Sequence, residues 1–203
     1  MEELLGERVD VGGAGRTDAG VHAIAQVAHL RARRNHPAKE IQYGLNDRLP
    51  SDINILRVEE AHPKFHARHD ALMRYYLYQI STRRTAFAKP FVWWIKDKLD
   101  VDLIAQAASR FVGRRDFASF CDRDEQNQST IVEVYESRVE MIGALILYRI
   151  GASHFLWRMV RPVVGTLAQV GRGEITIEDV EQLLRKHSRE PARWSGAAIG
   201  TVP

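Results

Sequence analysis

The sequence has a single cysteine and no long apolar run, and each shortage excludes a class of protein. With Cys121 alone, the 203 residues can form no internal disulfide and contain no Cys-x-x-Cys zinc pattern. The longest apolar stretches, such as 142–147, are far shorter than the roughly 20 residues that a transmembrane helix needs. Residues 1–5 lack the basic and apolar regions of a secretory signal. We therefore predict a cytoplasmic protein without a metal site.

The composition otherwise fits an ordinary globular chain, with one bias toward arginine. Hydrophobic residues make up 45% and charged residues 27%, and the length suffices for one large domain or two small ones. Of the 29 basic residues, six are lysine and 23 are arginine. Because a guanidinium binds phosphate with two hydrogen bonds and stacks on bases, this bias is compatible with an RNA partner. It can equally reflect genome composition.

The patterns along the chain predict an α+β fold with a largely antiparallel sheet. Residues 59–63 mark a boundary between two subdomains, 1–61 and 62–203. In the first we predict a helical turn ending at Gly6, strands at 8–11, 23–30 and 53–58, and a helix at 38–48. In the second we predict a strand at 72–80, a helix at 101–112 capped by Asp100, a polar loop at 121–129, a hairpin of 131–140 with 144–150 around Gly143, a helix at 153–170, and a helix from Thr176 to near His187.

The glycine-rich segment 15–23 holds the strongest candidate for a functional site. Asp18 lies two residues from Arg16 and two from Gly20, in a segment that follows the short apolar run 9–11. An aspartate on a tight turn beside a fixed positive charge favours an ionised, exposed nucleophile or base. The alternative is a turn aspartate that bonds its own backbone. The density of special residues is greater than a turn requires, but both interpretations stay open from the residues alone.

Two further segments contain candidate binding residues. In a strand, Arg74, Tyr76 and Tyr78 share one face, which suits stacking on a nucleobase or, equally, packing against neighbouring side chains. In the helix predicted at 153–170, His154, Arg158 and Arg161 fall on one side, as in any amphipathic surface helix. The apolar residues around Arg161 favour a buried carboxylate partner for it.

Some shorter motifs allow more than one interpretation. Residues 65–68, Phe-His-Ala-Arg, could form a hinge or a phosphate contact, and Trp93-Trp94 suits a core or an interface. The adjacent His69 and Asp70 resemble a catalytic pair, but neighbouring residues in a strand face opposite ways.

In several ordered blocks the chain resembles the TruA family of tRNA pseudouridine synthases. The resemblance rests on Gly15-Arg16-Thr17-Asp18-Ala19-Gly20-Val21-His22, Phe65-His66-Ala67-Arg68, Arg74-x-Tyr76-x-Tyr78, Asp116-Phe117-x-Ser119-Phe120, and Phe155-Leu156-x-x-Met159-Val160-Arg161-x-x-Val164-Gly165-Thr166-Leu167. These blocks follow the family order from about residue 8 to about residue 187. The resemblance implies two ferredoxin/RRM-like subdomains that share the antiparallel sheet, with an active-site cleft between them.

The same resemblance implies a role for each site residue. Asp18 would be the catalytic aspartate, and Tyr76 would stack on the target uracil. Arg161 would pair with the Asp18 carboxylate, and Arg16 would position the RNA, with Arg68 and Arg74 as further substrate-binding residues. The family isomerises uridines at about positions 38–40 of the tRNA anticodon stem-loop, without a cofactor and as a homodimer. No membrane partner and no small-molecule cofactor are expected.

The chemistry leaves the route of the reaction open. The N1–C1′ bond must break and C5 must join C1′, so the base has to leave its stack and be received by an aromatic platform. An ionised aspartate can attack C6 or C1′, or it can stabilise or deprotonate a sugar intermediate.

Compared with the family, the N-terminus is shortened and the C-terminal residues 191–203 are atypical. Two alternatives to the enzyme therefore stay open. One is a tRNA-binding remnant without activity, and the other is a longer gene that begins upstream of Met1.

Overall fold

The computed structural model describes residues 1–122, 129–197 and 201–202, so most of the polar loop predicted at 121–129 lies outside the described residues. The chain divides into two compact units. Unit 1 contains Met1–Arg16 and Ala25–Ala71, and unit 2 contains Thr17–Ile24 and Leu72–Pro203. No helix in the described part of the chain is long and apolar enough to cross a membrane.

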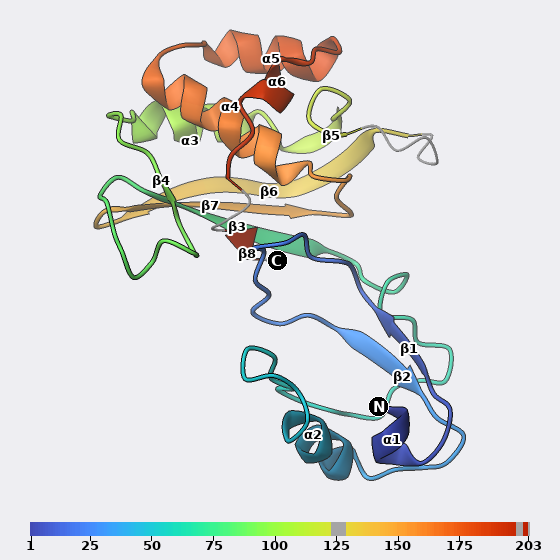
Figure 1. Cartoon of the computed structure of the whole chain (residues 1–203). Helices are drawn as coiled ribbons and strands as arrows, with labels where there is room; N and C mark the ends of the chain where they lie inside the picture. The colour runs from blue at the N-terminus through green and yellow to red at the C-terminus, as the bar shows by residue number, and fades with distance from the viewer. Residues whose placement is uncertain (123–128, 198–200, 203) are drawn as a thin grey trace. The chain divides into compact units, whose positions relative to one another are not determined.

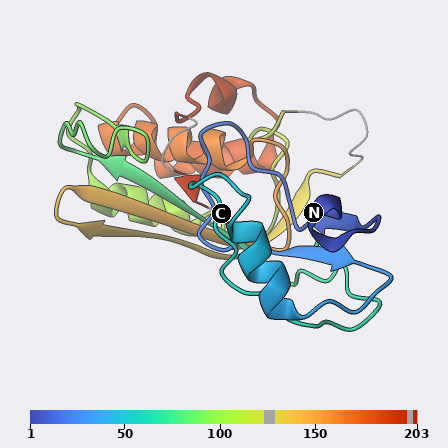
Figure 2. The ribbon, with the colours of Figure 1, turned by 60° about the horizontal axis from the view of Figure 1, so that its bottom comes forward.

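In its described residues, unit 1 combines two helices with a two-stranded sheet (Figure 2). Its elements are α1 (Glu2–Leu5), β1 (Asp10–Gly13), β2 (Ala28–Arg31) and α2 (Ala38–Asn46), and the two strands pair antiparallel. Gly6 ends α1 in the left-handed conformation, with φ of 65°, as predicted. The Leu4 methyl groups occupy the space that a side chain at Gly44 would need, and this packs α1 against α2.

The strand predicted at 53–58 does not form, because side chains of α2 bind its backbone. Asn46 accepts the Ile55 N–H at 2.7 Å and donates to the Ile55 carbonyl at 3.1 Å. Gln42 donates to the carbonyls of Ile55 and Leu56 at 3.2 and 2.8 Å. Since these amides satisfy the groups that a neighbouring strand would satisfy, the segment needs no sheet partner.

The strand predicted at 23–30 is shorter than expected and begins only at Ala28. The ladder with β1 extends by one hydrogen bond, from the Ala14 N–H to the Val27 carbonyl at 2.8 Å. Residues 17–24 make their contacts within unit 2 and are therefore not available to pair with β1.

Unit 2 is built on a six-stranded sheet (Figure 1). Its strands are β3 (Arg74–Ser81), β4 (Trp93–Trp94), β5 (Gly113–Asp116), β6 (Ile131–Ile142), β7 (Leu145–Ala152) and β8 (Thr201–Val202). The order is β4-β3-β7-β6-β5, and β8 also pairs with β3; every pair is antiparallel except β3 with β4. The predicted hairpin of β6 and β7 is confirmed, with Gly143 in its turn at φ of 58°.

The helices of unit 2 lie on one face of this sheet (Figure 1). They are α3 (Val101–Ser109), α4 (Val160–Arg172), α5 (Ile177–Arg185) and α6 (Glu190–Arg193). Both predicted caps are confirmed, since Asp100 accepts the Leu103 N–H at 3.0 Å and Thr176 forms a capping box with Asp179. The core between helices and sheet is large and rich in aromatic residues; its biggest members include Tyr78, Phe111, Phe117, Phe120, Tyr148 and Met159.

The helix predicted at 153–170 begins seven residues later, at Val160. Pro162 lacks an N–H and is tolerated only in the first turn of a helix, which fixes the start close to it. Arg158, with φ of 58°, turns the chain just before the helix. His154 and Arg158 therefore precede α4, and the prediction that they share a helix face with Arg161 is wrong.

The predicted α+β class and its mostly antiparallel pairing are confirmed. The described strands nevertheless form two sheets, one in each unit, where a single shared sheet was expected. In unit 1, β1 and β2 pair only with each other among the described residues, and the candidate third strand is held by α2 instead.

Candidate active site

Asp18 lies on an exposed turn in the segment Thr17–Ile24, and this segment belongs to unit 2. The Val21 N–H donates to the Asp18 carbonyl at 3.0 Å, which closes a four-residue turn. Gly20 occupies its third position with φ of 82°, the conformation that a type II turn requires there. The turn directs an aspartate side chain into solvent, so the carboxylate is accessible to a substrate.

Tyr76 of β3 is the aromatic residue that lies near this carboxylate. The ring is half-buried and packs against Phe155 in a T-shaped arrangement, with ring centroids 4.7 Å apart. Burial raises the pKa of the Tyr76 hydroxyl, the negative charge of Asp18 raises it further, and the positive charge of Arg74 opposes both. The structure thus brings Asp18, Arg74 and Tyr76 into one electrostatic cluster, with a tyrosine that stays protonated at neutral pH.

Arg74 is positioned at the beginning of β3 by a backbone contact. Its guanidinium donates to the Ser153 carbonyl at 3.0 Å, just beyond the end of β7. Burial lowers the pKa of the neighbouring His154, and the Arg74 charge lowers it further. Arg74 therefore adds a fixed positive charge beside Tyr76, and it reinforces the burial that favours the neutral form of His154.

Tyr78, on the same face of β3, belongs to the core. It is fully buried, packs edge-on against Trp93, and donates its hydroxyl proton to the Ala197 carbonyl at 2.6 Å. The face predicted from Arg74, Tyr76 and Tyr78 therefore has two functions. Tyr76 stays accessible near Asp18, whereas Tyr78 anchors the C-terminal segment.

Arg161, in the first turn of α4, is held by that same C-terminal segment. Its Nε donates to the Gly196 carbonyl at 2.9 Å, and the Gly196 N–H donates to the Arg161 carbonyl at 3.0 Å. Its positive charge lies near Tyr78, where it opposes the rise in the Tyr78 pKa that burial causes. Within the described part of the chain, the ion pairs do not include one between Asp18 and Arg161.

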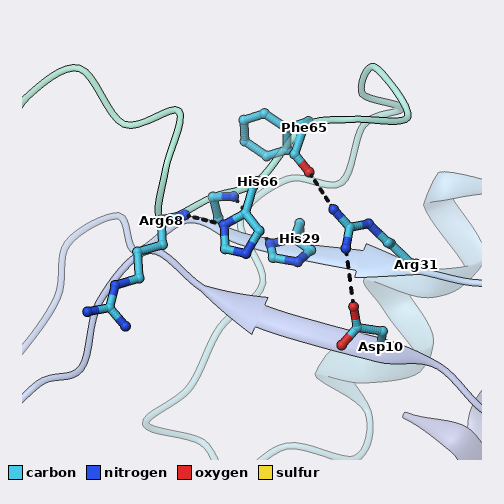
Figure 3. A network of polar contacts seen from close by, with 7 residues as sticks. Asp10, His29, Arg31, Phe65, His66 and Arg68 are labelled. Atoms are coloured by element: carbon cyan, nitrogen blue, oxygen red, sulfur yellow. Dashed lines mark hydrogen bonds and ion pairs between the residues drawn. The ribbon is translucent and has the colours of Figure 1, made fainter.

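The other two candidate arginines, Arg16 and Arg68, belong to unit 1 and are both exposed. The segment that carries Arg68 is fastened to β2 by side-chain contacts (Figure 3). His29 accepts the Ala67 N–H at 3.2 Å, and Arg31 donates to the Phe65 carbonyl at 3.3 Å. The Arg68 side chain extends away from these imidazoles (Figure 3), so the network fixes its backbone and presents its guanidinium outward.

Three histidines form the centre of this network in unit 1. The ring centroids of His29 and His66 are 4.5 Å apart, and those of His66 and His69 are 4.3 Å apart. Desolvation and then the charges of His69, His29 and Arg31 lower the pKa of His66. Its Nδ1 accepts the Arg68 N–H at 3.2 Å, so the ring acts as an acceptor in its neutral form.

Sequence reasoning missed this network. His62 and His66 have a His-x-x-x-His spacing that was overlooked in predicting no metal site. Among the described residues, no group of three or more His, Cys, Asp or Glu side chains is arranged to hold a metal ion. His29 lies in the strand predicted at 23–30, and no signal in the sequence showed that the structure would bury this imidazole.

Comparison with known proteins identifies the family. A family model described as tRNA pseudouridine synthase matches residues 1–70 and 107–201. The tRNA pseudouridine synthase A of Dictyoglomus thermophilum is 39% identical over 204 residues, covering 97% of this chain and 83% of the relative. That of Brevibacillus brevis is 37% identical, covering 98% and 83%. The tRNA pseudouridine synthase A 2 of Bacillus cereus is 33% identical, covering 98% and 82%.

The candidate residues divide between these matched stretches. Arg16, Asp18, Arg68 and Arg161 fall within the residues that the family model matches. Arg74 and Tyr76 fall between them, in the interval 71–106, which the alignments with whole relatives cover.

Proposed function

The chain belongs to the tRNA pseudouridine synthase family, and from this premise we propose that it converts uridine to pseudouridine in the anticodon stem-loop of tRNA, with Asp18 as the catalytic residue. The observation that carries the proposal is the exposed Asp18 turn, whose carboxylate lies close enough to Tyr76 to raise the pKa of its hydroxyl. An extruded uracil needs a surface to stack on, and a carboxylate beside an aromatic ring suits its isomerisation.

The bonds that break and form in the reaction define what the carboxylate of Asp18 must do. The N1–C1′ bond breaks, a C5–C1′ bond forms, the C5 proton leaves to solvent, and N1 gains a proton. While the base is detached, C1′ lacks electrons. An ionised Asp18 compensates by bonding to the sugar or by taking a proton from it, and either route regenerates the free carboxylate.

Tyr76 is the proposed platform for the extruded base. Phe155 packs against the ring edge-on and fixes its plane, so the uracil meets a rigid surface. Because its pKa is raised, the hydroxyl keeps its proton at neutral pH and can donate a hydrogen bond to the base. Arg74 supplies positive charge at the same place, which suits a phosphate of the target nucleotide.

The remaining arginines are proposed to hold the RNA. Arg16 and Arg68 contact the phosphate backbone, in keeping with their exposure in unit 1. Arg161 uses its Nε for Gly196, so its two terminal amino groups are the donors directed to substrate or, once RNA is bound, to Asp18. The proposal includes the homodimer that the resemblance to the family implies, and a tRNA substrate supports the cytoplasmic location that the composition predicted.

The decisive experiment replaces Asp18→Asn and measures tritium release from tRNA labelled at uridine C5. We expect a loss of about 10²- to 10⁴-fold in rate, because the amide keeps the shape of the side chain and loses its charge. Asp52→Asn is the matched control, since Asp52 is also an exposed turn aspartate but lies in unit 1. Its activity should equal that of the wild type.

Three outcomes distinguish the alternatives. Loss of release with unchanged tRNA affinity supports catalysis by Asp18. Persistence of release in Asp18→Asn contradicts the assignment of this residue. A wild-type protein that binds tRNA and releases no tritium is a binding protein and not an enzyme. Mapping the modified uridines by reverse transcription tests the position in the anticodon stem-loop, and sedimentation equilibrium tests the dimer.

A further inference from the structure

The segment between β3 and β4, residues 82–94, combines exposed aromatic rings with positive charge. Phe87 is 98% exposed, Phe91 44% and Trp94 41%. The cations Arg83, Arg84 and Lys89 are also exposed, and the segment contains no Asp or Glu. Apolar groups that gather at a surface are typical of a binding site, because leaving them in water is unfavourable. We call residues 82–94 the aromatic–basic segment.

The two ends of this segment are fixed to the sheet. The Thr82 N–H donates to the Ala144 carbonyl at 2.9 Å, and the Ile95 N–H donates to the Ser81 carbonyl at 3.0 Å. Val92 and Ile95 are buried, with 4% and 2% of their surface exposed. The exposed rings are therefore presented on an anchored base, which reduces the entropy lost when a ligand binds.

The aromatic–basic segment also contacts the loop that carries Asp18. The ring of His22 packs on Phe91 with centroids 4.8 Å apart, and both residues belong to unit 2. His22 lies four residues after Asp18 in the same loop. A ligand held at the catalytic carboxylate would extend naturally onto this surface.

We propose that the aromatic–basic segment is a second tRNA-binding surface, on which Phe87 stacks with an unpaired nucleobase near the target uridine while Arg83, Arg84 and Lys89 contact the adjacent phosphates. The inference rests on the proposed function, because it takes the RNA at Asp18 as its starting point. It concerns residues within 71–106, which the family model does not match.

The chemistry favours RNA over other partners. Unpaired bases stack on aromatic side chains, and their phosphates pair with Arg and Lys, so one strand satisfies both kinds of group. Arg84 already lies over the Trp94 ring, 5.6 Å from its centroid, and holds a cation beside an exposed π-face. A two-fold contact centred on the segment would place it against its own copy and bring like charges together, which opposes that use.

The test compares Phe87→Leu with Phe87→Tyr in the full-length chain. The leucine removes the π-face and keeps an apolar side chain, so we expect Kd for tRNA and KM to rise about tenfold with little change in kcat. The tyrosine keeps the π-face and should restore both values. Tyr43→Leu removes an exposed aromatic ring, 62% accessible, from α2 in unit 1 and should leave Kd unchanged.

The contribution of the basic side chains can be measured separately, from the salt dependence of tRNA binding. Replacing Arg84→Gln and Lys89→Gln together should reduce the slope of log Kd against log salt by about 1.4, if each cation neutralises one phosphate of a single strand. An unchanged slope contradicts the phosphate contacts.

The outcomes also separate this inference from the proposed function. A wild type that forms pseudouridine while Phe87→Leu keeps its Kd and KM contradicts the second surface and leaves the enzyme intact. A wild type that forms none but binds tRNA through Phe87 supports the surface and contradicts the enzyme. If Phe87→Leu lowers the sedimentation coefficient without changing tRNA affinity, the segment is a protein interface and the inference is wrong.

Discussion

The two units of this protein are stabilised in different ways. Unit 2 has a large apolar core in which helices cover one face of a six-stranded sheet. Unit 1 has a small apolar cluster around Leu5, Ile41 and Leu45 and depends on polar side chains that bind backbone groups. Glu7 is an example, because it accepts the N–H groups of Arg33 and Arg34 at 3.1 Å and pairs with His36 at 2.8 Å.

This difference bears on the site residues. Tyr76 is fixed by apolar packing within unit 2, whereas Arg68 is fixed by hydrogen bonds to imidazole rings in unit 1. Packing is sensitive to changes in volume, and a polar network is sensitive to the loss of a single partner and to pH. A substitution that changes side-chain volume should therefore destabilise unit 2, and one that removes a hydrogen-bond partner should destabilise unit 1.

The largest effect is expected from Gly165→Ala in α4. A Cβ at this position would lie 1.9 Å from the Trp194 carbonyl oxygen, and backbone cannot move aside as a flexible side chain can. We expect unit 2 to lose about 3 kcal/mol of unfolding free energy, measured by urea denaturation. Arg161 should also lose its contact with Gly196, because residues 194–197 must shift.

Gly171→Ala provides the control for this prediction. A Cβ there would lie 2.5 Å from Cδ1 of Ile104, a side-chain terminus that can rotate. The cost should be clearly smaller than at Gly165. Equal costs for the two variants would mean that the tight approach to Trp194 is not what limits the packing of unit 2.

An intermediate effect is expected from Asn46→Ala in unit 1. The substitution leaves the Ile55 N–H without its partner in α2 and leaves the Ile55 carbonyl with Gln42 as its remaining donor, at a cost of about 2 kcal/mol. Limited proteolysis should then cut within 53–58 before any other described segment. Asn46→Asp keeps the acceptor of the Ile55 N–H, and Gln42 still donates to the Ile55 carbonyl, so its effect should be clearly smaller. Resistance of 53–58 in Asn46→Ala would contradict the polar account of unit 1.

The smallest effect is expected from pH on the histidine network. Because the pKa of His66 is lowered in the folded protein, its stabilising contribution is present above the ordinary value of about 6.5 and is lost as the pH falls from there through the folded pKa. Protonation of Nδ1 removes the acceptor of the Arg68 N–H, while His69, His29 and Arg31 repel the new charge and Asp70 attracts it.

Amide exchange at Arg68 measures this effect locally. The protection factor of this amide, in which the intrinsic pH dependence of exchange is divided out, should fall below about pH 6.5 in the wild type and lose most of that dependence in His66→Gln. A local measurement is needed because the lowered pKa of His154 gives unit 2 a stability change of the same sign. Identical pH profiles in the two proteins would contradict a role for His66.

The sequence predicted those elements of the fold that local signals determine. Gly6, Asp100, Thr176 and Gly143 each mark a helix end, a cap or a turn, and the structure has these features where they were expected. The prediction of a strand at 53–58 was wrong because the backbone of this segment pairs with two amide side chains from α2. Alternation in a sequence does not distinguish such a partner from a neighbouring strand. The predicted start of α4 was also wrong, although Pro162 indicated in the sequence where the first turn of the helix lies.

For the site, sequence identified the turn of Asp18 and the strand of Tyr76 but not their surroundings. Alternation placed Tyr76 and Tyr78 on one face, and only the non-local packing of residues 194–197 separates the accessible ring from the buried one. The position of Arg161 against Gly196 depends on the same segment. The roles of Arg16, Arg68, Arg74, Tyr76 and Arg161 in binding RNA remain predictions.

The division of the chain has a consequence for spectroscopy. All four tryptophans, Trp93, Trp94, Trp157 and Trp194, belong to unit 2. Indole emission therefore arises from unit 2, while far-ultraviolet circular dichroism averages the secondary structure of both units. Since unit 1 has no indole of its own, its unfolding should be followed by circular dichroism alongside fluorescence.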